Sequence, residues 1–175
     1  MSRYINNPTA QHIAPCLSSN NWNSIDSTYT LWRASVHEAS HAICHVANGI
    51  KVKKVEVYRE NKHWIGFTST ERQPGVTPLS PIRTDLAVGS GFLAGHIGEL
   101  IHASPVPEYH NFDEILTAQM VSQTLAMKSH KVDLYKHTGI ILLRNNPSLL
   151  ALANTLMSQK LVSGTQLIHL LKGVN

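Results

Sequence analysis

The sequence predicts an α+β fold that is mainly helical, with a small antiparallel β-hairpin or sheet beside a helix that carries an H-E-x-x-H motif. Apolar residues recur at helical spacing between Ser27 and Ala47, which is typical of an amphipathic helix. Alternating valines follow in residues 51–58, as in a half-buried strand. The 175 residues suffice for one domain with its own core. We expect that domain over residues 27–175, after a polar arm at 1–26.

The composition excludes several classes of protein. Hydrophobic residues make up 42% and charged residues 15% of the chain, which is a globular and not a disordered balance. No apolar run approaches the roughly 20 residues that span a bilayer, and no signal peptide is visible at the N-terminus. Two cysteines are too few for a disulfide framework. We therefore expect a cytoplasmic protein without a membrane span.

The charge pattern does not favour a nucleic-acid partner. Lys and Arg exceed Asp and Glu by 15 to 11, and the only tight basic group, at residues 51–54, alternates with valines as one face of a strand does. Nucleic-acid binding needs a clearer basic stripe. The unusual number is histidine, with 11 residues, and because His is a common metal ligand and acid–base group, their positions decide their meaning.

The first long element is the helix from about Ser27 to Ala47. Residues 1–26 before it are rich in Asn and Ser without clear periodicity, so we expect an irregular arm. Asn48-Gly49 ends the helix, because Gly is common just past a helix C-terminus. The apolar stripe that defines the helix consists of Leu31, Ala34, Ala39, Ala42, Ile43 and Val46.

Two strands follow the helix. Lys51–Tyr58 and His63–Thr70 are separated by a short polar turn, which predicts an antiparallel hairpin. Trp64 and Phe67 fall on opposite faces of the second strand, so we expect at least one of them in the core. Residues 71–82 contain three prolines and a glycine and predict a loop.

Helices are expected through the rest of the chain. Residues 85–103 are helical in content but contain four glycines, and small residues at that density let another element approach closely. A further helix is expected from Phe112 to about Lys128. Asn146-Pro147 is a helix start signal, with Pro in the first turn. Ser163-x-x-Gln166 resembles a capping box before a leucine-rich segment.

The motif that predicts chemistry is His37-Glu38-Ala39-Ser40-His41. Residues four apart on a helix return to nearly the same face, so both imidazoles can reach one ion, and neutral imidazole suits zinc. Glu38 follows the first histidine and can act as a general base and then a general acid for a zinc-activated water. The alternative is a histidine-rich helix with solvated side chains, which the helical context disfavours.

A catalytic zinc needs a third protein ligand. His45 lies about 6 Å further along the same helix, so we expect it in packing or at the surface and not as a ligand. The extended form H-E-x-x-H-x-x-G-x-x-H is absent. The carboxylates in later predicted helices are Glu99, Asp113 and Glu114, and the spacing alone does not choose among them.

Several blocks, in order, resemble the FtsH-type zinc peptidases. V-H-E-A-S-H-A-I at 36–43 resembles the family's H-E-A-G-H-A block, and 52–57 resembles the strand after it. I-G-F-T at 65–68 resembles L-G-Y-T, and E-L-I at 99–101 matches the end of G-G-R-A-A-E-E-L-I. F-D at 112–113 with T-A at 117–118 resembles the N-D-hydrophobic-x-x-A-T block. The resemblance covers roughly residues 30–172, including closing helices over 142–171.

The resemblance also has departures. Ser40 stands where the family has Gly, which a helix tolerates well. The G-G-R-A-A part is degraded at residues 93–97. No G-x-x-x-x-G-K-[ST] phosphate loop occurs anywhere, and the family's membrane helices and ATPase module are missing. The sequence therefore looks like a free-standing peptidase domain of this type.

The resemblance implies roles for individual residues. His37, His41 and Asp113 are implied as ligands of one zinc ion per chain, and Glu38 as the catalytic residue. Glu99 is implied as a residue that orients a ligand histidine. Glu114 points about 100° away from Asp113 on a helix, so we expect it at the surface. The strand residues that would bind an extended substrate through its backbone are Trp64, Ile65, Gly66, Phe67 and Thr68.

The expected function is that of a zinc metalloendopeptidase without its own ATPase. It would hydrolyse peptide bonds of flexible or unfolded proteins, unless a separate ATPase or adaptor delivers its substrates. The family forms hexamers partly through its ATPase rings, so a homo-oligomer is compatible with the sequence but not specified by it. Two alternatives remain open: a zinc-binding but catalytically silent interaction module, and a dedicated peptidase that acts on one regulatory partner.

Overall fold

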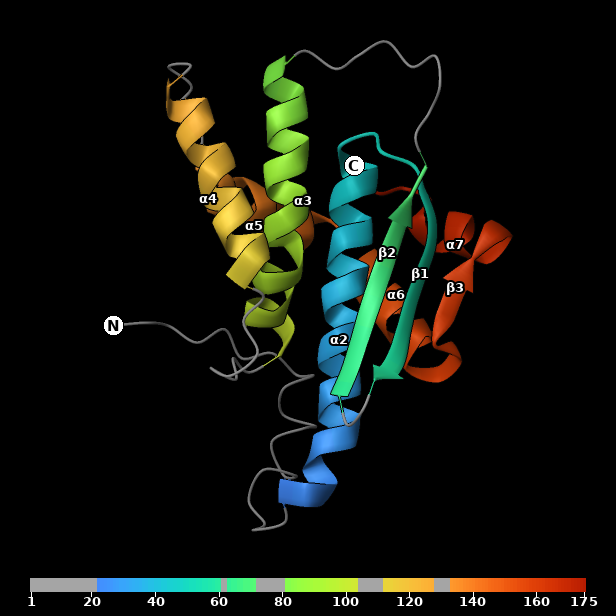
Figure 1. The fold of residues 1–175 in the computed structure, drawn as a ribbon. Coiled ribbons are helices and arrows are strands. Elements are labelled where there is room, and N and C mark those ends of the chain that lie inside the picture. Colours follow the sequence, from blue (N-terminus) through green and yellow to red (C-terminus); the bar gives the residue numbers. More distant parts are fainter. Residues whose placement is uncertain (1–21, 61–62, 72–80, 104–111, 128–132) are drawn as a thin grey trace.

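A computed structural model describes residues 22–60, 63–71, 81–103, 112–127 and 133–175. The described part is mainly helical, with one small antiparallel sheet. This confirms the α+β, mainly α, class. Figure 1 shows helix α2 (Trp22–Ala47) in the centre, with the sheet on one side and α3 (Pro81–His102) on the other. None of the described helices combines the length and apolar character that crossing a membrane requires.

The sheet has three strands in the order β2-β1-β3. β1 (Val52–Glu60) pairs with β2 (His63–Thr70) and with β3 (Leu161–Ser163), antiparallel in both cases. The predicted hairpin is therefore confirmed. Because β1 lies in the middle, the outer edge of β2 pairs with no other strand of the described residues, and α2 packs against the same sheet.

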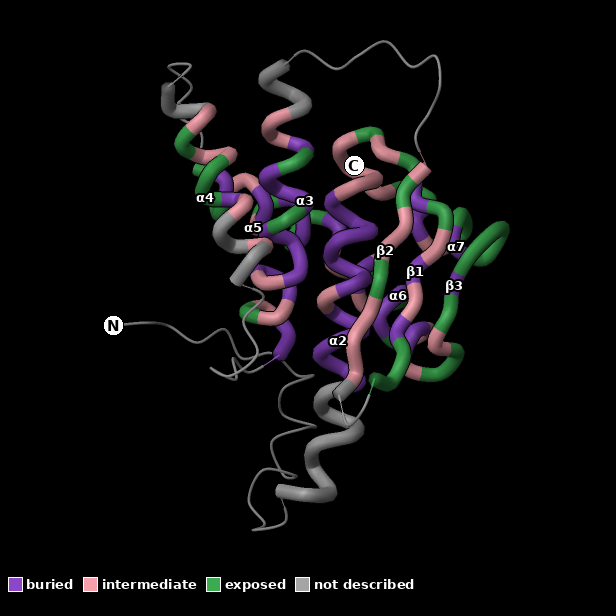
Figure 2. The backbone as a smooth tube through the Cα atoms, in the orientation of Figure 1, coloured by how far each residue is buried: buried purple, intermediate pink, exposed green. Residues whose placement is uncertain are grey.

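The remaining helices pack against α3 on one side and against α2 and the sheet on the other. α4 (Phe112–Met127) and α5 (Leu134–Arg144) pack against α3, while α6 (Asn146–Gln159) packs against α2 and α7 (Gly164–Leu171) follows β3. Figure 2 shows buried residues concentrated in α2 and α3, whereas β2 has none among its described side chains. The fully buried core residues include Val36 and Ile43 of α2, Val55 and Val57 of β1, and Leu149, Leu152 and Leu156 of α6.

The side chains of β1 alternate between the core and solvent, with one interruption. Val52, Val55 and Val57 are buried, whereas Lys53 and Tyr58 are exposed. The pairing shifts by one residue between Val52 and Lys54, so the buried valines do not follow a strict period of two.

The glycines of α3 allow close packing against α2, as the sequence predicts. A side chain at Gly98 would overlap the hydroxyl of Ser40, and one at Gly95 would overlap the ring of His37. Both glycines are buried. The absence of a Cβ at these positions thus brings the backbone of α3 against the face of α2 that carries the H-E-x-x-H motif.

Three sequence expectations need correction. The helix before the hairpin begins at Trp22, five residues earlier than expected, and only residues 1–21 of the expected arm lie outside the described part. Strand β3 was not expected, because three residues are too few to show alternation. Ser163 precedes α7 but makes no capping hydrogen bond with its side chain, so the capping box is wrong.

Candidate metal centre

The two histidines of the motif face the same point. His37 and His41 lie one turn apart on α2, and their Nε2 atoms are 2.9 Å apart. Their rings meet edge to face, with centroids 4.6 Å apart. Both side chains are largely shielded from solvent. Helical spacing therefore places two potential nitrogen ligands together, as the motif predicts.

In each of these two histidine rings, the other nitrogen, Nδ1, lies within hydrogen-bond distance of an oxygen acceptor. His37 Nδ1 is 2.7 Å from Oε1 of Glu99, and His41 Nδ1 is 2.8 Å from the backbone oxygen of Gly91. A carbonyl oxygen only accepts hydrogen bonds, so His41 Nδ1 must carry the proton. In the neutral ring this leaves the Nε2 lone pair free. The same pattern of Nδ1 partners is usual for metal-bound histidines.

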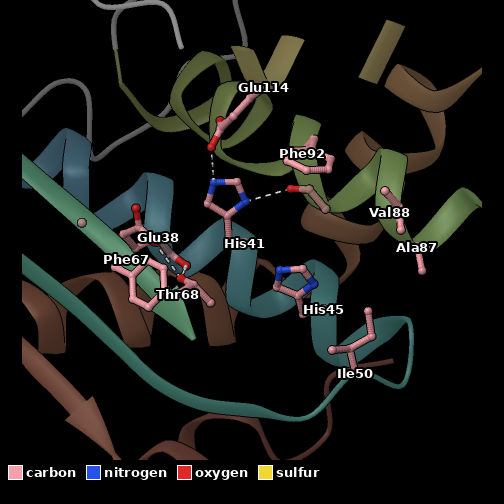
Figure 3. A pocket seen from close by; sticks show the side chains of 12 residues that line it. Glu38, His41, His45, Ile50, Phe67, Thr68, Ala87, Val88, Phe92 and Glu114 are labelled. Atoms are coloured by element: carbon pink, nitrogen blue, oxygen red, sulfur yellow. Dashed lines mark hydrogen bonds and ion pairs between the residues drawn. The ribbon is translucent and has the colours of Figure 1, made fainter. Parts of the chain in front are cut away.

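A carboxylate from α4 completes the cluster. Glu114 Oε2 lies 3.4 Å from His37 Nε2, and Glu114 Oε1 lies 3.4 Å from His41 Nε2. Oε2 is buried and has no hydrogen-bond partner. Figure 3 shows the Glu114 side chain pointing from above at the ring of His41. An unpartnered buried carboxylate oxygen is costly, and a cation between these three residues would remove that cost.

The spacing of these atoms fits a tetrahedral ion. Ligands at about 2.0–2.1 Å from a tetrahedral zinc lie about 3.3 Å from one another. The two Nε2 atoms are 2.9 Å apart, and each lies 3.4 Å from an oxygen of Glu114, Oε2 for His37 and Oε1 for His41. Within the described residues, His37, His41 and Glu114 form a group able to hold a metal ion. Two imidazoles with one carboxylate suit zinc, and three protein ligands leave one position open.

The charges of the site also fit a divalent cation. Glu38, Glu99 and Glu114 are buried or half-buried around the histidines, and Arg33 Nε is 2.5 Å from Oε2 of Glu99. With neutral histidines, three carboxylates and one guanidinium leave two negative charges among these residues. Such charge is expensive to bury without compensation. A divalent ion would neutralise it.

Without a metal, a proton on His37 compensates part of this negative charge. Burial acts to lower the pKa of His37, but its contacts with the carboxylates of Glu114 and Glu99 and the charge of Glu38 outweigh it and raise the pKa to about 10. Burial acts to raise the pKa of Glu114, but its ionic contacts with His37 and His41 outweigh it and lower the pKa to about 2. The metal-free site is therefore an ion pair, and a metal must displace the proton of His37.

Glu38 lies beside the cluster and is held by β2. Its residue is only 6% exposed. The hydroxyl of Thr68 is 2.7 Å from Oε2 of Glu38 and 3.0 Å from its backbone oxygen. A side chain at Gly66 would overlap the side chain of Glu38. Both strand residues therefore restrict where the carboxylate can lie.

An open pocket of about 360 Å³ connects these groups. Glu38, His41 and Glu114 line it near the metal cluster, and Phe67 and Thr68 line it from β2. Figure 3 shows apolar side chains around the rest of it, from α3 and from the turn after α2. A molecule in this pocket would touch the metal cluster, Glu38 and strand β2 at once.

His45 lines the same pocket but does not belong to the metal cluster. Its ring stacks near that of His41, with centroids 6.5 Å apart. Nδ1 is buried without a hydrogen-bond partner. Burial, and then the charge of His41, lower its pKa to about 4. His45 is therefore a neutral wall of the pocket at pH 7.

The structure places Glu114 of α4 where the sequence did not predict it. Glu114 was expected at the surface, which is wrong, because its carboxylate reaches both histidines. Asp113, the expected third ligand, is in α4, but its side chain lies outside the described residues. Glu99 makes the contact with His37 that an orienting role requires. The spacing alone did not choose between these two acids, and the family resemblance indicated Asp113.

Two further residues were missed. Arg33 lies one turn before His37 on α2 and is buried against Glu99. A basic residue on the inner side of an amphipathic helix could have been noticed as out of place. Thr68 was expected to bind substrate through its backbone, but not to contact Glu38, because that contact depends on how the sheet packs on α2.

The residues expected on the substrate strand divide into two groups. Gly66, Phe67 and Thr68 line the pocket. Trp64 packs against the core and under the ammonium of Lys160, 5.2 Å from its ring centre, and Ile65 is half-buried. The part of β2 that lines the pocket is therefore its middle, residues 66–68.

Comparison with known proteins adds no assignment. No model of a known family matches the sequence, and no curated protein matches it significantly.

Proposed function

We propose that this protein is a zinc metalloendopeptidase. The observation that carries the proposal is the joint placement of His37, His41 and Glu114, with Glu38 on the same pocket. Two histidines with fixed Nδ1 partners, a carboxylate and an adjacent general base form the set of groups that metal-assisted hydrolysis needs. The resemblance of the sequence blocks to FtsH-type peptidases supports the same reaction.

The chemistry divides between the ion and the protein. Bound zinc would act as a Lewis acid on the substrate carbonyl and lower the pKa of a water ligand towards neutral. Glu38 takes the proton of the attacking water and passes it to the leaving amine. Thr68 holds the carboxylate of Glu38 at the pocket, and Glu99 holds the ring of His37.

The substrate would bind as an extended chain. The outer edge of β2 pairs with no strand of the described residues, and Gly66, Phe67 and Thr68 line the pocket beside Glu38. Backbone pairing to such an edge places a peptide without regard to most of its side chains. This mode requires an unfolded or flexible substrate, and a separate ATPase or adaptor would be needed for folded ones.

The proposal is tested by cleavage of unfolded casein with zinc-loaded protein. We expect wild type to cleave casein and Glu38→Gln to lose about 10²- to 10⁴-fold in rate while it still binds zinc, because a general base contributes about that factor. Glu60→Gln is the matched control, since Glu60 is an exposed acid on β1. Equal cleavage by wild type and Glu38→Gln would overturn the role of Glu38. Zinc binding without cleavage by wild type would favour a silent interaction module or a dedicated peptidase.

A further inference from the structure

The pocket has an uncharged end, away from Glu38 and Glu114. Four apolar residues form its walls: Ile50 after α2, and Ala87, Val88 and Phe92 of α3. Figure 3 shows them grouped around the ring of His45. We call this end, formed by these five residues, the apolar arm. It continues directly from the metal cluster, because His41 and Gly91 line the same pocket.

Two of these side chains, both from α3, are partly exposed to solvent. Val88 and Phe92 are 40% and 38% exposed, and they lie one turn apart on the same face of α3. Single exposed apolar residues are ordinary, but adjacent ones that line a pocket mark a binding surface. An apolar group that enters the arm would remove both from water.

His45 limits the depth of the arm without adding charge. Its ring packs towards α3, where a Cβ at Gly91 would lie 3.1 Å from the ring. Gly91 therefore leaves just enough room for the imidazole. Among the described residues, no acidic side chain, Lys or Arg lines the arm, whereas the carboxylates of Glu38 and Glu114 lie at the metal end.

We propose that the apolar arm binds a large apolar side chain of the substrate, from the residue next to the peptide bond that is cleaved. This inference rests on the proposed peptidase function. A peptide whose carbonyl lies at the metal cluster and whose backbone follows β2 has its adjacent side chain within reach of the arm. Phe or Leu there would cover Val88 and Phe92, while Lys or Asp would lose its hydration without a partner.

The binding of small inhibitors tests the role of the apolar arm without requiring that the protein cleave a substrate. The probes are dipeptide hydroxamates, which bind zinc through the hydroxamate, with Ala, Phe or Lys as the first side chain. We expect the zinc-loaded wild type to bind the Phe probe at least about ten-fold more tightly than the Ala probe by calorimetry. Val88→Glu and Phe92→Glu should lose that preference and gain affinity for the Lys probe, because each places a carboxylate in the arm.

The control is Leu100→Glu, an exposed apolar position of α3 that does not line the pocket, and it should keep the wild-type preference. Because Val88 and Phe92 are partly exposed, each glutamate variant is expected to fold, and two variants guard against the failure of one. Equal affinity of wild type for the Ala and Phe probes would overturn the proposal. So would a Phe preference that survives in both glutamate variants.

The outcomes separate this inference from the proposed function. If casein is not cleaved but the Phe preference is present and is lost in the glutamate variants, the arm is a side-chain site and the peptidase activity is what fails. If casein is cleaved but the probes are bound without preference, the peptidase activity holds and the arm does not select substrates.

Discussion

Arg33, Glu99 and His37 form a chain of charged hydrogen bonds between α2 and α3. Arg33 Nε lies 2.5 Å from one oxygen of Glu99, and His37 Nδ1 lies 2.7 Å from the other. Because both oxygens are occupied, the carboxylate cannot rotate freely. Partners of this kind fix the orientation of a ligand ring and raise its affinity for metal. Arg33 therefore positions His37 through Glu99.

Replacing Arg33 should weaken zinc binding without direct contact to the ion. We expect Arg33→Met to lower the zinc affinity about 10- to 100-fold, as removal of such partners typically does, and Arg33→Lys to restore part of it. Competition with a chromogenic chelator measures the affinity. In a Glu99→Gln background the same change should have little further effect. A full additional loss there would show that Arg33 does not act through Glu99. Arg59→Met, at an exposed position of β1, serves as the control.

At the residue scale, the sequence predicted what depends on one helix. The spacing of His37 and His41 on α2 was enough to bring their Nε2 atoms together, and Glu38 follows from the same spacing. The contact of Glu114 with the two histidines could not be predicted in this way, because it depends on how α4 packs on α3. The angular spacing of residues on a helix shows which side chains point in different directions. It does not show which of them faces another element of the fold.

The packing of α2 against α3 decides the geometry of the site at the scale of elements. Gly95 and Gly98 face His37 and Ser40, and neither has room for a Cβ in the present arrangement. Ser40 also bonds back to the oxygen of Val36. A change at this contact would move α3, and Glu99 and Gly91, which hold the two histidines, would move with it.

Adding a side chain at the contact between α2 and α3 should destabilise the folded protein. We expect Gly98→Ala to lower the free energy of unfolding by about 1–3 kcal/mol, because overpacking a tight contact costs about that much. Adding Ser40→Gly should recover part of the loss by removing the clashing hydroxyl. Urea unfolding followed by circular dichroism measures both variants.

The control for this change is Gly139→Ala in α5, where a Cβ would meet nothing within 4 Å. Ala is favoured over Gly inside a helix by about 0.5–1 kcal/mol, so this variant should be as stable as wild type or more stable. A Gly98→Ala protein that is as stable as Gly139→Ala would show that the two helices are not in tight contact.

The elements that the sequence predicted well are those with a strong periodic signal. The strand His63–Thr70 and the helix from Phe112 have the expected starts, and α6 begins at Asn146 as its Pro signal indicates. Strand β3 has only three residues and is defined by its pairing with β1. β3 forms only because the chain after α6 lies beside β1, and no local sequence pattern predicts that position.

At the scale of the whole molecule, one core joins the sheet, α2, α3 and α6. Cys44 belongs to it and is fully buried in α2. Burial raises the pKa of its thiol to about 12. In the unfolded chain the thiol ionises near its usual pKa of 9.0. The folded state therefore holds far less thiolate at pH 8, and its stability falls as the pH rises from 9 towards 12.

Alkylation of Cys44 should report on opening of this core. In a Cys16→Ser background, which leaves one thiol, we expect iodoacetamide at pH 8 to react at least about 100-fold more slowly with the native protein than with the urea-unfolded chain, because the thiolate is the nucleophile. Mass spectrometry of timed samples gives the two rates. Native and unfolded rates within a few-fold of each other would contradict a closed core around α2.

The zinc content of the dialysed protein, determined by native mass spectrometry, is the decisive test of the proposed metal centre. We expect one zinc ion per chain in wild type and in Glu38→Gln, and at least about a 100-fold weaker affinity in Glu114→Gln, because loss of a ligand should exceed the loss of an orienting partner. Asp113→Asn, in the same turn of α4, should keep its zinc. Wild type that retains no zinc, or Asp113→Asn that loses it while Glu114→Gln keeps it, would contradict the metal centre described above.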